Sequence, residues 1–171
     1  MEKPILFNTA MVQAILKSKK SSTRRPFKKP FEVHPNGMIT KPQGNERLVP
    51  YEPPYHVGDI IYVRETWLKG DDGLHYRADE TPISKEAREA YGYKWKPSIH
   101  MPKVAARLFL KVTDVMAERI QDITEDGANK EGFDNVLPVF TAKELFQAEW
   151  NSIYKNWDEN PWVWVIEFEK V

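Results

Sequence analysis

The sequence predicts a single α+β domain, built as a small mixed-sheet barrel that short helices decorate. Its 171 residues, of which 41% are hydrophobic, are enough to bury one ordinary core. About five or six segments have the composition of strands, and they do not alternate regularly with the helical segments. A doubly wound fold would need helices between successive strands, so the mixed barrel is favoured.

The first third of the chain predicts a strand, a helix and a long loop. Residues 4–7 have the composition of a short strand, and Asn8 or Thr9 can cap the helix that follows. From Pro26 to Pro54 the sequence is rich in Pro, Gly and Asn with little periodicity, which predicts an irregular loop. Loops of this length are usually functional or mobile. The apolar face of the helix is expected to carry Met11, Ile15 and Leu16.

Alternating apolar and polar residues predict two half-buried strands, Ile60–Thr66 and Arg107–Val115. In the first strand, Ile61, Val63 and Glu65 share one face. If that face is the core face, Glu65 is a semi-buried carboxylate that needs a cation, and the basic segment described below could supply it. Between these strands we expect a hairpin turn at Asp71–Gly73, a short helix at Ser84–Ala90 and an extended segment at Trp95–Pro102.

The last third predicts two capped helices and an inner strand. Thr124 can cap a short helix that stops at Gly132, and Thr141 with Glu144 forms a capping box for a longer one. Trp162–Phe168 is hydrophobic on both faces, which is typical of a strand inside a sheet or barrel. The longer helix is expected to place Phe146, Trp150, Ile153 and Trp157 in the core.

Composition limits the chemistry that this chain can perform. The absence of cysteine excludes disulfides, thiolate nucleophiles and thiolate metal sites. The four histidines are widely scattered, so we expect no zinc site, and no motif indicates a cofactor. No stretch reaches the ~20 apolar residues of a membrane helix, and no apolar signal-peptide core is present, which favours a cytoplasmic protein.

Charge is balanced overall but unevenly distributed. The acidic residues collect between Glu118 and Glu159, whereas the segment Lys17–Lys29 contains no acid. Such a patch attracts phosphates, and a nucleotide, nucleoside or RNA in an adjacent cleft is the expected partner. A solvated surface loop would explain the pattern equally well. The basic residues of this segment are Lys17, Lys19, Lys20, Arg24, Arg25, Lys28 and Lys29.

A Lys and a Thr three residues apart, Lys20 and Thr23, are candidates for catalysis. A Thr hydroxyl is a weak nucleophile until a base removes its proton. A Lys can be that base when desolvation or the neighbouring Arg24 and Arg25 lower its pKa. A carboxylate such as Glu131 could position the Lys or pass a proton to a leaving amine.

Cations and aromatic rings are the candidates for substrate binding. Trp67 or Trp95 could stack on a base, although such residues more often pack a loop onto the core. Glu65 is included because a buried carboxylate near the basic segment could face the ligand. The expected phosphate contacts are Lys19, Lys20, Arg24 and Arg25.

Five blocks of the sequence, taken in order, resemble a known family. They are Ile15–Arg25, Gly58-Asp59 before a strand, Val112–Val115, Ile123–Gly132 and Trp164–Phe168. Together they resemble the ASCH domain, a member of the PUA-like group of small β-barrels that bind RNA or modified bases. The blocks cover less than half of the chain, but all five match the ASCH pattern in both their order and their residue types. The resemblance implies a PUA-like barrel with a cleft beside the basic segment.

The rest of the chain resembles a longer ASCH branch that bacteriophages and prophages often carry. The resemblance therefore implies one ASCH domain over residues 1–171, with insertions at about 26–55 and 68–103. This sequence differs from the usual ASCH pattern in two places: Ser18 stands where Gly is usual, and Ser21 stands where Thr is common.

Some ASCH proteins hydrolyse the acetyl amide of N4-acetylcytidine. The resemblance places their catalytic Lys, Thr and Glu at Lys20, Thr23 and Glu131 and their usual Arg at Arg25. Four hypotheses stay open at this point: a module that binds RNA or nucleotides, an amidohydrolase of an acylated base, a ribonuclease, and an interaction protein of a phage.

Overall fold

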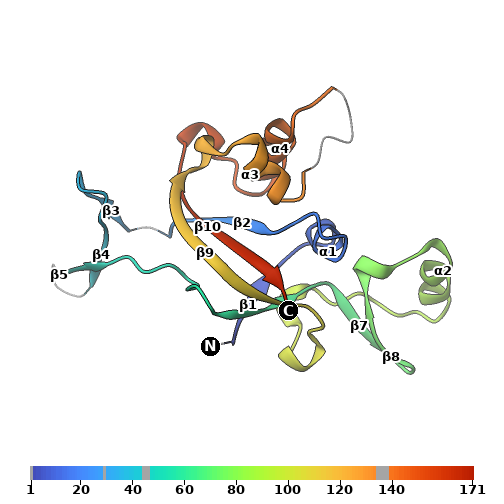
Figure 1. The fold of residues 1–171 in the computed structure, drawn as a ribbon. Helices are drawn as coiled ribbons and strands as arrows, with labels where there is room; N and C mark the ends of the chain where they lie inside the picture. The colour runs from blue at the N-terminus through green and yellow to red at the C-terminus, as the bar shows by residue number, and fades with distance from the viewer. Residues whose placement is uncertain (1, 29, 44–46, 134–138) are drawn as a thin grey trace.

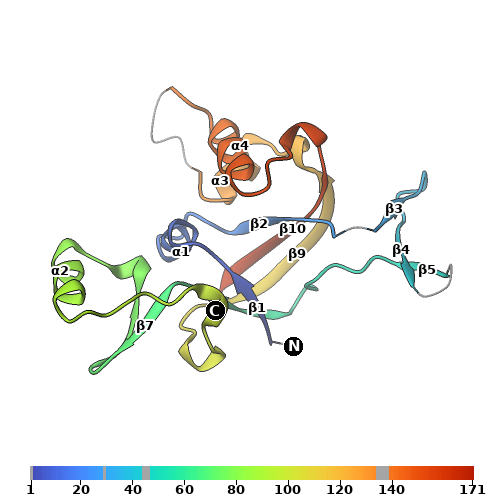
Figure 2. The same cartoon turned by 180° about the vertical axis from the view of Figure 1, so that it is seen from behind.

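The computed structural model describes residues 2–28, 30–43, 47–133 and 139–171, and it has an α+β fold around one mixed, strongly curved sheet (Figures 1 and 2). The strand order is β1-β6-β9-β10-β2. Strands β1 and β6 are parallel, and the other neighbours are antiparallel. The predicted α+β class is confirmed. The bounds are β1 Glu2–Leu6, β2 Ser22–Pro26, β6 Ile60–Arg64, β9 Phe109–Arg119 and β10 Trp162–Lys170.

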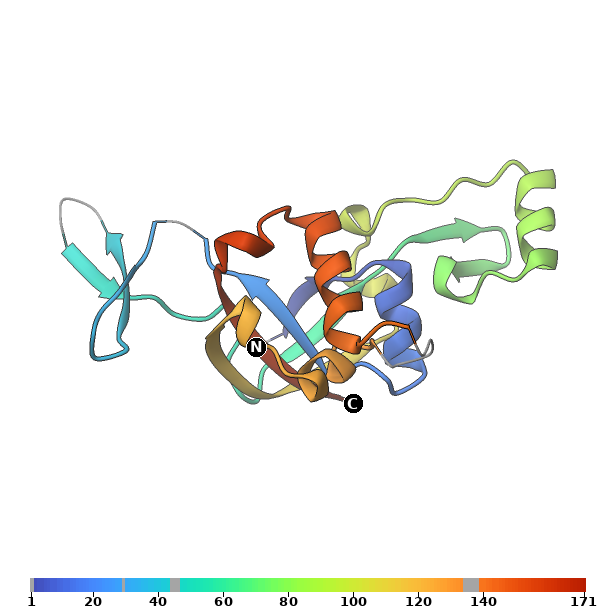
Figure 3. The same ribbon diagram turned by 90° about the horizontal axis from the view of Figure 1, so that it is seen from above.

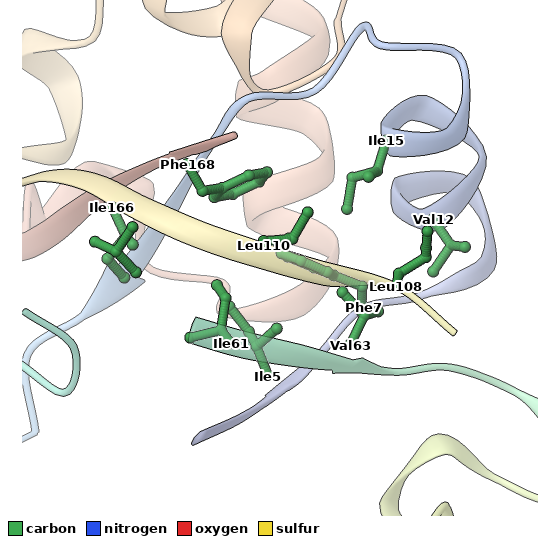
Figure 4. Close-up of a cluster of buried hydrophobic side chains, with 11 residues drawn as sticks. Ile5, Phe7, Val12, Ile15, Ile61, Val63, Leu108, Leu110, Ile166 and Phe168 are labelled. Atoms are coloured by element: carbon green, nitrogen blue, oxygen red, sulfur yellow. The ribbon is translucent and has the colours of Figure 1, made fainter. Parts of the chain in front are cut away.

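Strand β10 is an inner strand, as the sequence predicts, and it contributes to two cores. Ile166 and Phe168 belong to the core beneath β1, β6 and the first helix (Figure 4). Val163 and Val165 point to the opposite face, where they pack against the helices near the C-terminus. Because side chains alternate along a strand, a strand with apolar residues at nearly every position must be covered on both faces.

Helix α1 (Thr9–Leu16) begins as predicted, since the side chain of Asn8 accepts a hydrogen bond from the backbone N of Met11 (2.8 Å). The helix ends at Leu16. Lys17 is its C-cap, and the last turn contains no basic residue, so the basic segment lies beyond the helix rather than in it. After the turn that follows this helix, Ser22–Pro26 forms β2 along the edge of the sheet, a strand that the sequence analysis does not predict.

Helices α3 (Glu125–Lys130) and α4 (Ala142–Ile153) lie together over one face of the sheet (Figure 1). Thr124 caps the first and Thr141 forms the predicted capping box with Glu144. Phe146, Trp150 and Trp157 are buried, but Ile153 is about half exposed, so its assignment to the core is wrong. None of the helices in the described part of the chain is long and apolar enough to cross a membrane.

Two lobes project from opposite ends of the sheet (Figure 3). The first corrects the prediction of an irregular loop at 26–54, because it contains a separate three-stranded sheet. Stacked rings join this sheet to the body: Phe27 packs on Trp164 with 4.5 Å between ring centroids, and the edge of Tyr51 meets Phe27 at 5.1 Å. Lys29 lies outside the described residues. The strands are β3 Glu32–Val33, β4 Ile39–Gln43 and β5 Arg47–Pro50.

The second lobe contains the predicted hairpin, formed by β7 (Trp67–Gly70) and β8 (Gly73–Tyr76), and the predicted helix α2 (Pro82–Ala90). The expected extended segment at 95–102 is interrupted by one 3₁₀ turn. The division of the chain into one domain with two insertions stays a prediction. The 3₁₀ turns of the structure are Arg77–Asp79, Ser98–His100, Lys103–Ala105, Ile120–Asp122 and Trp157–Glu159.

A charged contact holds the edge strand β1 to the turn before β6. Asp59 Oδ2 accepts hydrogen bonds from Lys3 Nζ (2.7 Å) and from the backbone N of His56 (3.0 Å). The hydrogen bond from Lys3 is the largest cause that lowers the pKa of the Asp59 carboxyl below its usual range.

We expect Asp59→Asn to lower the free energy of unfolding by roughly 1.5–3 kcal/mol at pH 7, the usual worth of a hydrogen bond to a charged group. A depressed folded-state pKa stabilises the fold above the unfolded value of 3.8 and loses that contribution as the pH falls. Urea denaturation should therefore give a smaller difference between wild type and variant at pH 3 than at pH 7. Equal differences at both values would contradict this account.

Candidate active site

Lys20 and Glu131, which are far apart in the sequence, form a buried ion pair. Lys20 Nζ lies 2.6 Å from Glu131 Oε2 and also donates to the Glu131 carbonyl oxygen (3.0 Å). The two residues form an isolated backbone bridge as well. Their side chains are 0% and 3% exposed, so this pair is shielded from water. The structure thus brings together two of the three predicted catalytic residues.

A tight reversal after α1 carries Lys20 into this position. Ser18 has φ 56°, in the left-handed region that favours glycine, and the backbone N atoms of Lys19 and Lys20 both donate to the carbonyl of Ala14. Gly132 has φ 99°, and a Cβ there would lie 2.9 Å from the Ala14 Cβ. The close approach of the two turns therefore depends on glycine at position 132.

Arg24 points into the molecule and holds the other oxygen of the same carboxylate. Its Nη1 donates to Glu131 Oε1 (3.2 Å), and its Nε donates to Glu118 Oε1 (2.7 Å). The Arg24 side chain is 6% exposed. The guanidinium sits so close to α3 that a Cβ on Gly127 would lie 2.9 Å from Arg24 Nη2. Arg24 holds Glu131 in place and also lines the pocket described below, so its predicted contact with substrate phosphates stays a prediction.

The environment of Lys20 lowers its pKa. Burial is the largest cause, because it penalises the charged ammonium, and Arg25 and Arg24 act in the same direction. The negative charge and hydrogen bond of Glu131 oppose them by favouring the ammonium. The net direction is downward, so Lys20 gives up its proton more readily than a solvated lysine.

Strand β2 presents Thr23 and Arg25 on one face of the sheet and Arg24 on the other, because side chains alternate. Thr23 pairs with Ile166 of β10 and is 2% exposed. Arg25 Nη2 donates to the carbonyl of Leu6 on β1 (2.7 Å).

The ring of Phe7 is a common wall for two cations of the basic segment. Its centroid lies 5.5 Å from Lys20 Nζ and 5.4 Å from the Arg25 guanidinium carbon. Both contacts are within the range of cation–π attraction. Lys20 and Arg25 are therefore held on the face of one buried aromatic ring.

A pocket of about 130 Å³ opens above Thr23, Arg24, Arg25 and Glu131. Its walls come from the start of α1 and from α4, and a hydrogen bond from Asn8 Nδ2 to Glu149 Oε1 (3.1 Å) joins these two walls. The pocket therefore contains Thr23 and Glu131, whose carboxylate binds Lys20. The remaining lining residues are Leu6, Met11, Phe133, Phe146, Trp150, Ile153 and Tyr154.

Glu65 is buried as expected, but the expectation that the basic segment pairs with it is wrong. Arg107 binds it through two hydrogen bonds, Nε to Oε1 (2.9 Å) and Nη2 to Oε2 (3.1 Å). Arg107 also donates to Asp79 in the second lobe. Arg107 lies just before β9, which pairs with β6, and this pairing of distant segments is not visible in the spacing of the sequence.

Neither of the predicted stacking residues lines the pocket above Thr23. Trp67 is buried against Met101 and Ala105, and Lys96 Nζ lies 5.0 Å from its ring centroid. Trp95 lines a different pocket in the second lobe. The rings that line this pocket come from α4 and its C-cap and from the residue after Gly132, and the sequence analysis assigned those of Phe146 and Trp150 wholly to the core. They are Phe133, Phe146, Trp150 and Tyr154.

The remaining predicted phosphate contact, Lys19, is exposed on the turn after α1. Lys17 and Lys28 are exposed too. The cations of the basic segment thus divide into an inward group, Lys20 and Arg24, and an outward group of lysines.

Arg24→Met should lower the free energy of unfolding by roughly 3 kcal/mol, because it leaves Glu118 and one oxygen of Glu131 without their cation. Arg77→Met, on an exposed arginine, is the matched control and should change stability by less than about 0.5 kcal/mol. Chemical denaturation checks both values. Equal small effects in the two variants would show that the buried network is not required for stability.

Comparisons with known proteins give two solved structures. No protein-family model matches the sequence, and no curated protein matches it. The hypothetical protein PH0355 is 14% identical, with a TM-score of 0.46 over 100% of both chains. The chain is also similar to the ASCH domain from Lactobacillus crispatus JV V101, with 15% identity and a TM-score of 0.46 over 99% of this chain and 79% of that one.

Proposed function

We propose that this protein binds a modified nucleobase or nucleoside and hydrolyses an acyl amide on its exocyclic nitrogen, with an N4-acylcytidine as the substrate class. The observation that carries the proposal is the position of Lys20. Its desolvated ammonium is held by Glu131, and Glu131 and Thr23 line the same pocket. The five sequence blocks that resemble ASCH domains support the same three residues independently of this geometry.

In the proposed reaction, Thr23 Oγ1 attacks the acyl carbon while neutral Lys20 accepts the hydroxyl proton. A tetrahedral intermediate forms and the carbon–nitrogen bond then breaks. The proton moves from Lys20 to the departing amino nitrogen of the base. In a second step water attacks the acyl-threonine ester while Lys20 takes a proton from the water. The bond from the acyl carbon to Thr23 Oγ1 breaks, and Lys20 returns the proton to Oγ1, so that the carboxylic acid is released and both Thr23 and neutral Lys20 are restored.

Glu131 has a positioning and electrostatic role in this scheme. Its carboxylate is bound on one oxygen by Lys20 and on the other by Arg24, so it cannot rotate away from the pocket. When Lys20 gains the proton of Thr23, the adjacent negative charge stabilises the ammonium that forms. The same charge limits how far burial can lower the pKa of Lys20.

The size of the pocket favours a small reacting group. About 130 Å³ is well below the ~300–1,000 Å³ of most ligand sites. It suits an acyl group with the amide edge of a base, while the sugar stays outside. The rings of Trp150 and Tyr154, 4.4 Å apart between centroids, offer apolar faces at the wall of this pocket.

Wild-type protein should release cytidine from N4-acetylcytidine or a related N4-acylcytidine, followed by chromatography. Lys20→Met should lower kcat/KM by roughly 10²- to 10⁴-fold, the usual worth of a general base. Thr23→Val should abolish turnover, because the nucleophile is gone. Thr113→Val, on the exposed face of β9, is the matched control and should keep full activity. Turnover retained in Thr23→Val would remove Thr23 from its role.

The rate should rise with pH, because Lys20 must lose its proton before it can act as a base. The midpoint of kcat/KM should lie below 10.5, the ordinary lysine value, since the pKa of Lys20 is lowered. In Glu131→Gln, the charge that raises this pKa is removed, so the midpoint should move to lower pH even if the rate is small. A midpoint that stays fixed would argue against Lys20 as the titrating base.

Binding of RNA without hydrolysis is the second candidate, and the outward lysines Lys17, Lys19 and Lys28 favour it. Phosphate contacts of this kind make affinity fall steeply with salt. Salt-dependent RNA binding that Thr23→Val leaves unchanged, together with no turnover of any acylcytidine, would favour this candidate over the hydrolase.

A further inference from the structure

A second pocket lies in the second lobe, away from Thr23. Its volume is about 650 Å³, within the ~300–1,000 Å³ of typical small-molecule sites. The β7–β8 hairpin forms one side and α2 with the segment after it forms the other (Figure 3). None of its lining residues is shared with the pocket above Thr23.

Aromatic rings form much of the lining: Tyr76, Tyr91, Tyr93 and Trp95. Tyr91 and Tyr93 lie 6.2 Å apart between centroids, and Tyr91 is 78% exposed. Tyr91 thus presents the face of an aromatic ring at the edge of this pocket, where a ligand can contact it.

The polar part of the lining is mainly acidic. Four carboxylates line the pocket, whereas Arg88 is the one lysine or arginine among the lining residues. The Arg88 guanidinium is itself neutralised, since its Nε donates to Glu80 (2.7 Å) and its Nη2 to Glu89 (3.2 Å). Glu80 is likewise neutralised by Arg88 and Asp79 by Arg107, so the charge of the pocket comes from Asp71 and Asp72. Asp71 accepts a hydrogen bond from the Tyr93 hydroxyl (2.8 Å), and Asp72 Oδ1 lies 2.7 Å from His75 Nε2. The negative charge of these two carboxylates attracts cations. The four carboxylates are Asp71, Asp72, Asp79 and Glu80.

Rings of this lobe already accept positive charges from the protein itself. The Arg107 guanidinium carbon lies 4.0 Å from the Tyr76 centroid, and that of Arg88 lies 5.6 Å from the Trp95 centroid. Both distances are within the range of cation–π attraction. Aromatic faces combined with nearby carboxylates are the surroundings that recognise organic ammonium groups.

We propose that this second pocket binds an organic cation with alkylammonium groups, such as a free polyamine or a lysine side chain of a peptide. The carboxylates of Asp71 and Asp72 at the hairpin turn supply the charge, and the rings around Tyr91 supply the apolar walls. The site is separate from the proposed hydrolase site and does not depend on it.

The test uses the full chain and two probes of equal length, hexane-1,6-diamine and hexane-1,6-diol, with tryptophan fluorescence and calorimetry as readouts. The diamine should bind and the diol should not, because only the diamine is charged. Asp71→Asn combined with Asp72→Asn should raise the Kd of the diamine by roughly tenfold, the worth of one or two charge contacts near a surface. Asp158→Asn, on an exposed aspartate that does not line the pocket, is the matched control and should leave the Kd unchanged.

A lysine-containing dipeptide amide distinguishes the two sources of the ligand. Competition of the dipeptide with the diamine would support a peptide side chain, and binding of the diamine alone would support a free polyamine. Equal binding of diamine and diol, or a diamine Kd that is unchanged in the double aspartate variant, would overturn the proposal. The proposed acylcytidine turnover uses residues outside this second pocket. The two proposals are therefore tested separately, and either one can fail while the other holds.

Discussion

A carboxylate withdrawn from water must keep cationic partners, and Glu131 keeps two. Lys20 binds one of its oxygens and Arg24 binds the other, while Glu118 completes the network by binding Arg24. These contacts join the turn after α1, strand β2, strand β9 and helix α3. Losing any one of them would leave a charge unpaired in a poorly solvated place.

The same contacts serve both stability and the proposed chemistry. Burial of Lys20 would be unfavourable without Glu131, yet burial is what makes this lysine a usable base. Arg24 resolves part of this conflict, because it lowers the pKa of Lys20 while satisfying Glu131. A chain that replaced the network with apolar residues could fold as well, but it would lack the lysine that the proposed chemistry uses as a base.

Patterns of neighbouring residues correctly predicted those helix starts and strands whose formation depends on a few adjacent positions. The caps at Asn8, Thr124 and Thr141 and the inner strand at the C-terminus follow from patterns within a few positions. Strand β2 was not predicted in this way. Its sequence shows no alternation of apolar and polar residues, and the burial of its charged residues depends on acids that are distant in the chain. The site was predicted in part: Lys20 and Glu131 meet, whereas the partner of Glu65 and the rings near Thr23 depend on which elements pack together.

The two ends of the five-stranded sheet, β1 and β2, meet beside the pocket, and Arg25 spans them with one hydrogen bond to Leu6. One rim of the pocket is therefore fastened by a side chain, and the other by the contact between Asn8 and Glu149. A hydrogen bond made by a side chain can lengthen or break without disturbing the pairing of any strands. Both rims of the pocket are thus held by single side-chain hydrogen bonds, and neither contact belongs to the backbone pairing of the sheet.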